Sequence, residues 1–122
     1  MAISLNHTIV PAHDKEASAK HIAHILGLKR IESMGHFAPV QVDDKFTLDF
    51  DNRDTFESHH YAFQVSDEEF DDIFGRIEEE KVVYGSLPNS QEDMQINNRR
   101  GGRGLYFKDV NGHSWEILTH PA

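Results

Sequence analysis

The same succession of sequence patterns occurs twice along this chain of 122 residues. Each copy begins with a short strand pattern, continues with an amphipathic helix pattern and ends with further strand patterns. The opening strands carry His7 and His60, which are 53 positions apart, and the helix caps Asp14 and Ser66 are 52 positions apart. Such closely matched offsets indicate an internal duplication. We therefore predict an α+β fold that contains two similar modules.

In the first copy, a strand pattern over 4–10 precedes a helix that Asp14 caps and that Gly27 ends. The helical spacing of the apolar residues between these two positions supports this prediction. Interrupted strand patterns follow over 29–42 and again over 45–50, where phenylalanine and leucine alternate with polar residues. The first copy is therefore predicted to fold as strand, helix and strands.

The second copy has the clearest helix of the chain. Ser66 and Glu69 form a capping box, and four apolar residues follow at helical spacing, namely Phe70, Ile73, Phe74 and Ile77. The hairpin near the end carries Asn111-Gly112, a pair that favours a type I′ turn. The strand patterns of this copy span 59–65, 82–85, 104–110 and 114–119.

A long polar segment, residues 86–103, separates two strand patterns of the second copy. Loops of this length in small domains are usually either functional or disordered. Its end carries Arg99, Arg100 and Arg103, whose guanidinium groups could bind an anionic substrate. A solvated loop is the alternative interpretation of the same residues.

The composition excludes several classes of function. The net charge of -9 argues against binding to nucleic acid or to anionic membranes, because both attract basic surfaces. Zero cysteines exclude disulfides, a thiolate nucleophile and cysteine-ligated metal sites. No apolar run approaches the length of a membrane span, and the first residues do not resemble a signal peptide, so we expect a cytoplasmic protein.

Nine histidines without a cysteine favour a metal site or proton transfer. His7 and His60 lie on the first strand of each copy, and Glu116 lies on the last strand. Two imidazoles and one carboxylate leave open positions on a divalent ion, as in the facial triad of non-haem iron enzymes. Spacing alone does not distinguish such ligands from ordinary strand residues.

Three segments resemble the vicinal oxygen chelate superfamily, which includes glyoxalases, bleomycin-resistance proteins and extradiol dioxygenases. They are Asn6–Val10 with the helix that follows, His60–Val65, and Tyr106–Glu116. The last resembles the family's closing hairpin, with Val110 and Asn111 in place of the usual proline and aspartate. The three segments occur in the family's order and together extend over nearly the whole chain.

The resemblance implies one domain, 1–122, with module one at about 1–56 and module two at about 57–122. Two βαβββ modules would form an open β-barrel-like cup around one divalent metal ion, Fe(II), Mn(II), Zn(II) or Ni(II). It places the metal ligands at His7, His60 and Glu116. It also places a tyrosine at Tyr106, either as a catalytic hydrogen-bond donor or acid, or as an aromatic residue of the barrel wall. A small-molecule substrate and a homodimer are further expectations, with the metal site within one chain or across the dimer.

The resemblance leaves the reaction open. The set His, His, Glu with Tyr106 favours extradiol-dioxygenase-like ring cleavage, although the family's pocket histidine would have to be His36. A glyoxalase-like lyase or isomerase is the first alternative, and it needs a second carboxylate, for which Asp49 and Asp51 are the candidates. A fosfomycin-type resistance enzyme shares the Tyr106 position, but in this chain Gln91–Arg103 replaces the lysine- and serine-rich cation loop expected of such an enzyme. The alternative without catalysis is a small-molecule binding protein of the bleomycin-resistance type.

The remaining histidines are weaker candidates. His59 is adjacent to His60 and should face the opposite side of its strand, because neighbouring side chains alternate. His21 and His24 are predicted to lie on a solvated helix face. His113 follows the turn glycine and could line the mouth of a pocket, although turn residues are mostly solvated.

Overall fold

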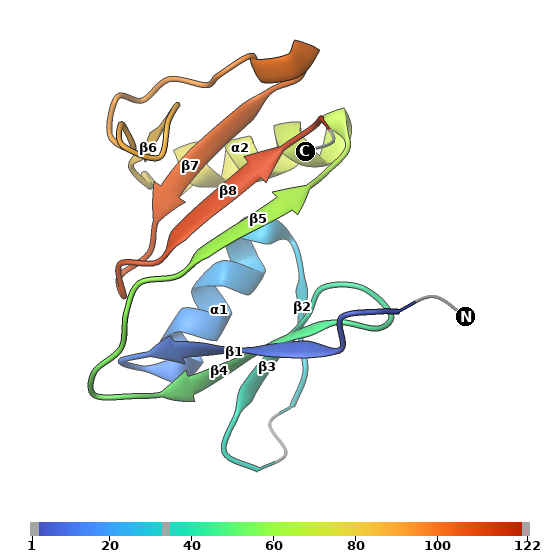
Figure 1. The fold of residues 1–122 in the computed structure, drawn as a ribbon, viewed down its shortest axis with the longest axis vertical. Helices are drawn as coiled ribbons and strands as arrows, with labels where there is room; N and C mark the ends of the chain where they lie inside the picture. Colours follow the sequence, from blue (N-terminus) through green and yellow to red (C-terminus); the bar gives the residue numbers. More distant parts are fainter. Residues whose placement is uncertain (1–2, 33–34, 121–122) are drawn as a thin grey trace. The chain divides into compact units, whose positions relative to one another are not determined.

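The computed structural model describes residues 3–32 and 35–120, and the chain divides into two compact units, 1–56 and 57–122 (Figure 1). Each unit has the element order strand, helix, strand, strand, strand. The predicted α+β class with two βαβββ modules is therefore confirmed. No helix in the described part of the chain is long and apolar enough to cross a membrane.

Unit 1 has one helix beside a four-stranded sheet in the order β1-β4-β3-β2. Strand β1 runs parallel to β4, and the other neighbours are antiparallel. The predicted strand over 29–42 is in fact two short strands, and positions 33 and 34 of that prediction lie outside the described residues. The bounds are β1 His7–Ala12, α1 Lys15–Leu26, β2 Lys29–Arg30, β3 Ala38–Gln41 and β4 Thr47–Asn52.

Alternation along β1 and β4 separates a buried face from a polar one. Val10 pairs with Phe50, and both are fully buried, as is Leu48. His7 and Asp49 belong to the opposite face, because they are an odd number of positions from Val10 and Phe50. Burial of an aliphatic or phenyl side chain of this size contributes about 1.5–3 kcal/mol. The buried face thus fixes the strand register, and the register fixes where the polar side chains lie.

Unit 2 repeats this architecture with the strand order β5-β8-β7-β6. Its first strand is again parallel to its last, and the other neighbours are antiparallel. The two units therefore share one topology, as an internal duplication predicts. The bounds are β5 His60–Gln64, α2 Asp67–Glu79, β6 Tyr84–Gly85, β7 Gly104–Lys108 and β8 Ser114–Leu118, with a 3-10 turn at Arg99–Gly101.

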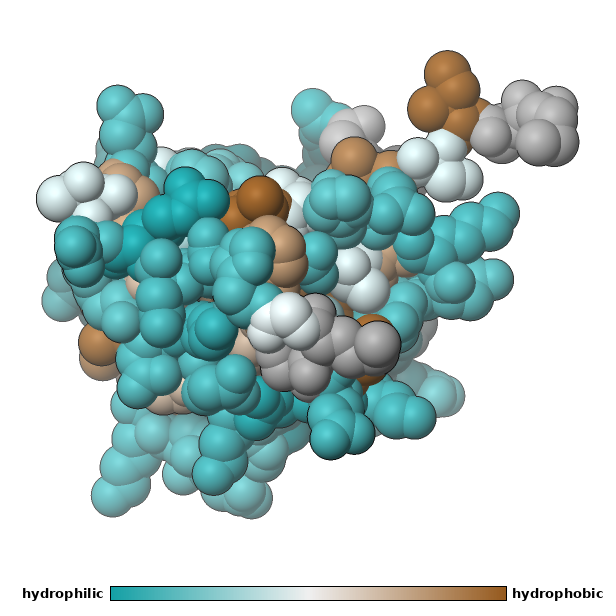
Figure 2. Space-filling model, turned by 90° about the horizontal axis from the view of Figure 1, so that it is seen from below, coloured by the Kyte–Doolittle hydropathy of each residue, from teal (hydrophilic) through white to brown (hydrophobic). Residues whose placement is uncertain are grey.

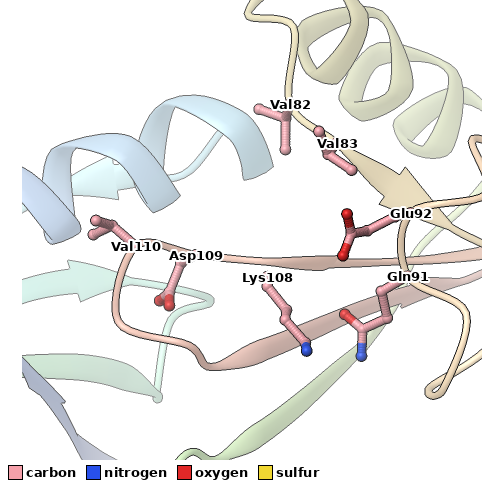
Figure 3. A pocket seen from close by; sticks show the side chains of 7 residues that line it. All are labelled: Val82, Val83, Gln91, Glu92, Lys108, Asp109 and Val110. Carbon is pink, nitrogen blue, oxygen red and sulfur yellow. The ribbon is translucent and has the colours of Figure 1, made fainter.

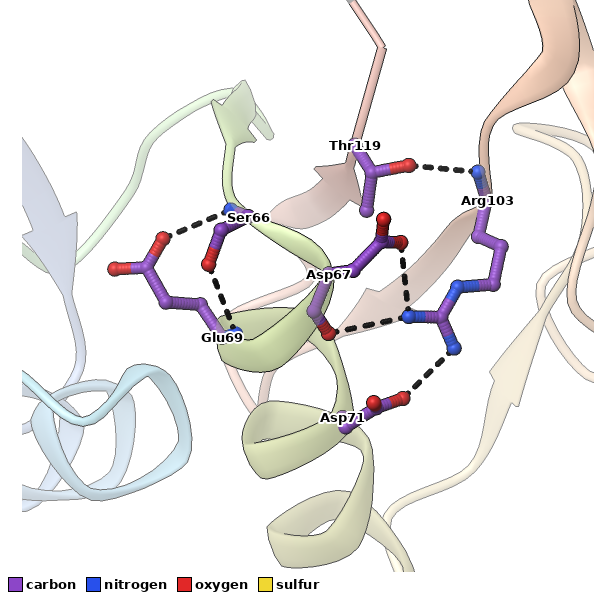
Figure 4. A network of polar contacts seen from close by, with 6 residues as sticks. All are labelled: Ser66, Asp67, Glu69, Asp71, Arg103 and Thr119. Atoms are coloured by element: carbon purple, nitrogen blue, oxygen red, sulfur yellow. Dashed lines mark hydrogen bonds and ion pairs between the residues drawn. The ribbon is translucent and has the colours of Figure 1, made fainter.

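Helix α2 begins with the predicted capping box, in which Ser66 and Glu69 exchange backbone and side-chain hydrogen bonds (Figure 4). The same turn holds Arg103, whose guanidinium donates to Asp71 at 2.8 Å and to Asp67 at 3.1 Å. This guanidinium also lies over a phenylalanine ring of α2, 4.5 Å from its centroid. Arg103 therefore ties the end of the long loop to the helix.

The hairpin between β7 and β8 is not the type I′ turn that the Asn-Gly pair predicted. The backbone N–H of Gly112 bonds the carbonyl of Asp109, and only Gly112 has a positive φ, 86°, in this turn. This is a three-residue loop in which the glycine provides the left-handed position. The reason is Asp109, whose carboxylate accepts from the backbone N–H groups of Asn111 and His113, both at 2.9 Å.

The face of the molecule in Figure 2 is mostly hydrophilic, and its hydrophobic side chains are scattered among charged and polar ones. This agrees with the acidic composition. Scattered exposed apolar residues are normal for a protein in water and do not by themselves indicate a binding surface.

Candidate metal and substrate site

One face of the sheet of unit 2 collects three of the four predicted site residues. Helix α2 lies against the other face, where the Phe74 ring meets the Tyr84 ring edge-on at 5.3 Å. Tyr84 pairs with Phe107, so the next residue along β7, Tyr106, belongs to the face opposite the helix. The site is therefore built on the side of the sheet that the helix leaves free.

The strand register brings the side chains of His60, Tyr106 and Glu116 close together. Tyr106 pairs directly with Glu116 across β7 and β8, and Ala62 pairs with Glu116 across β8 and β5. His60 is two positions from Ala62 and hence on the same face. Side chains in this diagonal relation are within reach of one another when they are long.

His60 and Glu116 are in direct contact. His60 Nε2 and Glu116 Oε1 are 3.0 Å apart, and the imidazole of His60 is 5.9 Å from the ring of Tyr106, centroid to centroid. The His60 side chain is 49% exposed, whereas that of Glu116 is 15% exposed. The imidazole of the pair is thus open to solvent, whereas the carboxylate is mostly buried.

Tyr106 is almost fully buried, and its hydroxyl lies between opposite charges. Arg99 Nη1 donates to the hydroxyl oxygen at 3.5 Å. Burial, a hydrogen bond to Glu116 and the charge of Glu116 raise the pKa of Tyr106, and Arg99 opposes this shift. The phenol accordingly keeps its proton near neutral pH and can act as a hydrogen-bond donor.

His7, the fourth predicted residue, opens β1 in unit 1 and is exposed. Its Nδ1 is 2.7 Å from the side-chain oxygen of Asn6, which favours the tautomer with the proton on Nδ1. The Nε2 nitrogen then keeps its lone pair. Asn6 is therefore an orienting residue that the sequence did not single out.

Asp49 occupies in unit 1 the position that Glu116 occupies in unit 2. Each is the third residue of the last strand, and each pairs with the third residue of the opening strand, two positions after His7 or His60. The Asp49 carboxylate accepts from Thr47 Oγ1 at 3.0 Å. Asp49 is thus the stronger of the two predicted second carboxylates by position.

Asp51, the other candidate, is engaged elsewhere. Its carboxylate accepts from Arg53 Nε at 2.8 Å and lies 3.8 Å from His36 Nε2. His36 itself precedes β3 in a bend and is not on a strand. Both residues therefore belong to a polar group near the end of β4 and the start of β3.

The contact between His60 and Glu116 fits a divalent cation. Two ligand atoms bound at about 2.1 Å and at right angles lie about 3.0 Å apart, which matches the separation of Nε2 and Oε1. Neutral imidazole nitrogen and carboxylate oxygen are both ligands that Fe, Mn, Zn and Ni accept. The chemistry and spacing of this pair are therefore suited to holding such an ion.

Comparison with known proteins agrees with this architecture. A solved structure named oxidase ChaP-H2 is 48% identical to the chain, with a TM-score of 0.94 over 99% of this chain and 96% of that one. The chain belongs to the vicinal oxygen chelate superfamily.

More distant relatives of the superfamily also match. The metallothiol transferase FosB of Lysinibacillus sphaericus (strain C3-41) is 27% identical in an alignment of 122 positions, which covers 95% of this chain and 82% of that protein. A glyoxalase/dioxygenase from Nostoc punctiforme shares the fold, with 24% identity and a TM-score of 0.72 over 98% of this chain and 92% of that one. No family model matches the chain.

The basic run at the end of the long loop has two separate roles in this superfamily member. Arg103 is held by carboxylates of α2, whereas Arg99 reaches the hydroxyl of Tyr106. The sequence presents these arginines as one cluster and gives no signal that separates them. Between the two arginines the chain turns through Arg100 and Gly101, which have positive φ values of 52° and 77°.

His113 is fully buried, although the turn position suggested solvation. Its Nδ1 accepts from the backbone N–H of His59 at 2.9 Å, and its ring lies against those of His59 and Tyr61. The ring therefore joins the ends of β5 and β8 on the helix side of the sheet. His59 lies on this side too, opposite His60, as alternation predicted.

Proposed function

We propose that this protein is a metal-dependent enzyme that oxidises a small molecule held through two adjacent oxygen atoms. Extradiol-dioxygenase-like ring cleavage, in which both atoms of dioxygen enter the product, is the preferred reaction. The contact between His60 and Glu116 on the open face of the sheet carries this proposal. The 48% identity to a protein named as an oxidase supports an oxidative reaction.

In this proposal His7, His60 and Glu116 hold one divalent ion. His7 comes from the same chain or, in a homodimer, from the second copy. When bound, the ion would supply Lewis-acid stabilisation of negative charge on the two substrate oxygens. Asn6 would hold the ring of His7 in the orientation that leaves Nε2 available for the ion.

Tyr106 and Arg99 are the residues that would contact the substrate. The hydroxyl of Tyr106 lies in the same group as His60 and Glu116. Its single proton is donated to Glu116 in this structure and would be available to a substrate oxygen once Glu116 binds the ion. Arg99 places a positive charge at that hydroxyl, which favours an anionic substrate such as a catecholate. The strand register fixes Tyr106 before the substrate arrives, whereas Arg99 is exposed on the loop.

A glyoxalase-like lyase is the second candidate, and Asp49 favours it. Its position repeats that of Glu116 in the other module, so it could supply the second carboxylate that such a reaction needs. Aspartate is one methylene shorter than glutamate, which argues against a direct role. A non-catalytic binding protein is the third candidate, and the polar set His60, Glu116 and Tyr106 argues against it.

Metal analysis and activity assays test these candidates. We expect about one ion per chain after loading with Fe(II), and loss of the ion in His60→Ala and Glu116→Gln. His59→Gln is the matched control, because the neighbouring histidine faces the other side of the strand. A ring-opened product from catechol and dioxygen supports the dioxygenase. Activity on a hemithioacetal alone would favour the lyase, and metal content that is unchanged in both variants contradicts the proposed site.

A further inference from the structure

His60 is the first residue of β5, so the position of its side chain depends on what holds the start of this strand. Strand β5 lies at the edge of its sheet and has a neighbour on one side only, β8. The chain before it, residues 53–59, contains no helix or strand. Ends of such elements open more easily than their centres. A contact to the backbone just before His60 would therefore decide how firmly this imidazole is placed.

His113 makes that contact. The backbone N–H of His59 donates to His113 Nδ1 at 2.9 Å, and the backbone carbonyl of His59 accepts from the N–H of Ser114, also at 2.9 Å. An imidazole nitrogen here takes the place of the backbone carbonyl that a regular parallel ladder would use. Because a backbone N–H can only donate, Nδ1 of His113 must be the acceptor, and the neutral ring carries its proton on Nε2.

The acceptor is itself held in place by its surroundings. His113 is fully buried, and its ring lies 5.2 Å from that of His59 and 6.0 Å from that of Tyr61, centroid to centroid. Its backbone N–H donates to the carboxylate of Asp109 at 2.9 Å, and its carbonyl accepts from the backbone N–H of Asp109 at 3.0 Å. Figure 3 shows Asp109 at the turn of this hairpin. The hairpin therefore fixes the imidazole that bonds the start of β5.

Unit 1 shows that the topology does not require this imidazole. By the register of the paired strands, Phe46 in unit 1 corresponds to His113 in unit 2. The backbone contact of Ser114 has its counterpart there, because the N–H of Thr47 donates at 3.1 Å to the carbonyl of the residue before His7. A phenyl ring has no nitrogen, so the side-chain contact has no counterpart at Phe46. The imidazole is thus an addition to the module that carries the pair of His60 with a carboxylate.

We propose that His113 is a positioning residue for His60. By bonding the backbone N–H of His59 it holds the start of β5, so that the imidazole of His60 stands 3.0 Å from Glu116 before an ion binds. His113 is on the other face of the sheet and acts through the backbone, without touching the ion. A ligand that is already in place loses less freedom on binding, so its supporting residues raise metal affinity. This inference rests on the proposed role of His60 as a metal ligand.

NMR spectroscopy of the ¹⁵N-labelled protein tests the contact without any metal in the sample. A hydrogen bond from N–H to a nitrogen transmits a scalar coupling between the two nitrogens, here His59 N and His113 Nδ1. We expect this coupling, together with the ring ¹⁵N shifts of a histidine that carries its proton on Nε2. A proton on Nδ1 of His113, or the absence of the coupling, would overturn the proposal.

Zinc titration by calorimetry tests the effect on the site, with two variants that separate the acceptor from the ring. His113→Phe copies unit 1 and keeps an aromatic ring without an acceptor, whereas His113→Asn keeps an oxygen acceptor without the ring. We expect the affinity for Zn(II) to fall about tenfold in His113→Phe and to stay close to that of the unchanged protein in His113→Asn. His59→Gln keeps its backbone N–H and is the matched control, which should bind zinc normally.

Urea unfolding of the same variants distinguishes positioning from a merely structural role. Zinc affinity that follows the free energy of unfolding, and not the presence of an acceptor, would contradict the inference. Equal zinc binding by both His113 variants and the unchanged protein, with loss of binding in His60→Ala, would also contradict it and would leave the proposed metal site standing. If the unchanged protein binds no zinc, the metal site itself is refuted, and this inference with it.

Discussion

The carboxylate of Asp109 should be the most sensitive polar group of the hairpin. It accepts from the backbone N–H groups of Asn111 and His113 at 2.9 Å and from Trp115 Nε1 at 3.0 Å. Trp115 is fully buried. Replacement Asp109→Asn keeps one oxygen for the backbone groups but turns an amide N–H₂ toward the indole N–H. Two donors then face each other, and the indole N–H belongs to a fully buried side chain.

The magnitude follows from that one lost contact. A hydrogen bond to a charged group contributes about 1.5–3 kcal/mol, and the buried indole N–H finds no replacement partner. We expect Asp109→Asn to lower the free energy of unfolding of unit 2 by about this amount, which is roughly a 10- to 150-fold change in the unfolding equilibrium. Asp109→Ala should cost more, since it also removes the backbone contacts.

Urea unfolding gives the measurement. Trp115 is the single tryptophan of the chain, so its fluorescence reports the unfolding of unit 2 directly. A double-mutant cycle with Trp115→Phe, followed by circular dichroism, isolates the contact, because phenylalanine has no N–H to leave unpaired. The reasoning is refuted if Asp109→Asn costs less than about 0.5 kcal/mol, the usual range of surface changes, or costs as much beside Phe as beside Trp.

Three further perturbations test the loop and the buried tyrosine. Gly85→Ala should push the loop off β6, because the added Cβ would lie 1.9 Å from Ser90 O, and limited proteolysis should then cut between 86 and 98. The hydroxyl of Ser86 lowers the pKa of Asp93. The contact between Asp93 and Ser86 therefore stabilises the loop above the ordinary aspartate pKa, and this stabilisation is lost as pH falls through the lowered pKa. The amide chemical shift of Ser86 should report this titration, and Asp93→Asn should abolish the pH dependence of that shift. Burial raises the pKa of Tyr61 to about 12, so the stability that its neutral form contributes is lost as pH rises from about 10 to about 12. Absorbance of tyrosinate should show a group that ionises near pH 12 and that Tyr61→Phe removes.

Regular patterns of the sequence predicted the two modules and the strands that carry the candidate residues of the second module. The apolar alternation and the helix caps fix each βαβββ unit, and the register then places His60, Tyr106 and Glu116 on one face without further assumptions. Their assignment as ligands and donor came from the resemblance to a family. Periodicity alone would not have distinguished His60 from a solvated strand histidine.

Contacts made by irregular segments could not be predicted in this way. The hairpin turn was misassigned because the side chain of Asp109, and not the local turn preference, determines its geometry. Gln91 is a polar residue in a polar loop, so nothing in its neighbours predicted its burial. Arg99 and Arg103 are chemically the same in sequence, and only the path of the loop sends one to Tyr106 and the other to α2.

The parallel pairing of the first strand of each unit with its last has a consequence for how the protein forms during synthesis. Unit 1 has all its strands once residue 52 has left the ribosome, so it can fold while the second half is still being made. In unit 2, β5 pairs with β8, which is made more than 50 residues later, so β5 has no neighbouring strand until then. His60 therefore meets Glu116 only after β8 has been made, and a nascent chain interrupted before that point would carry one folded unit and no assembled pair.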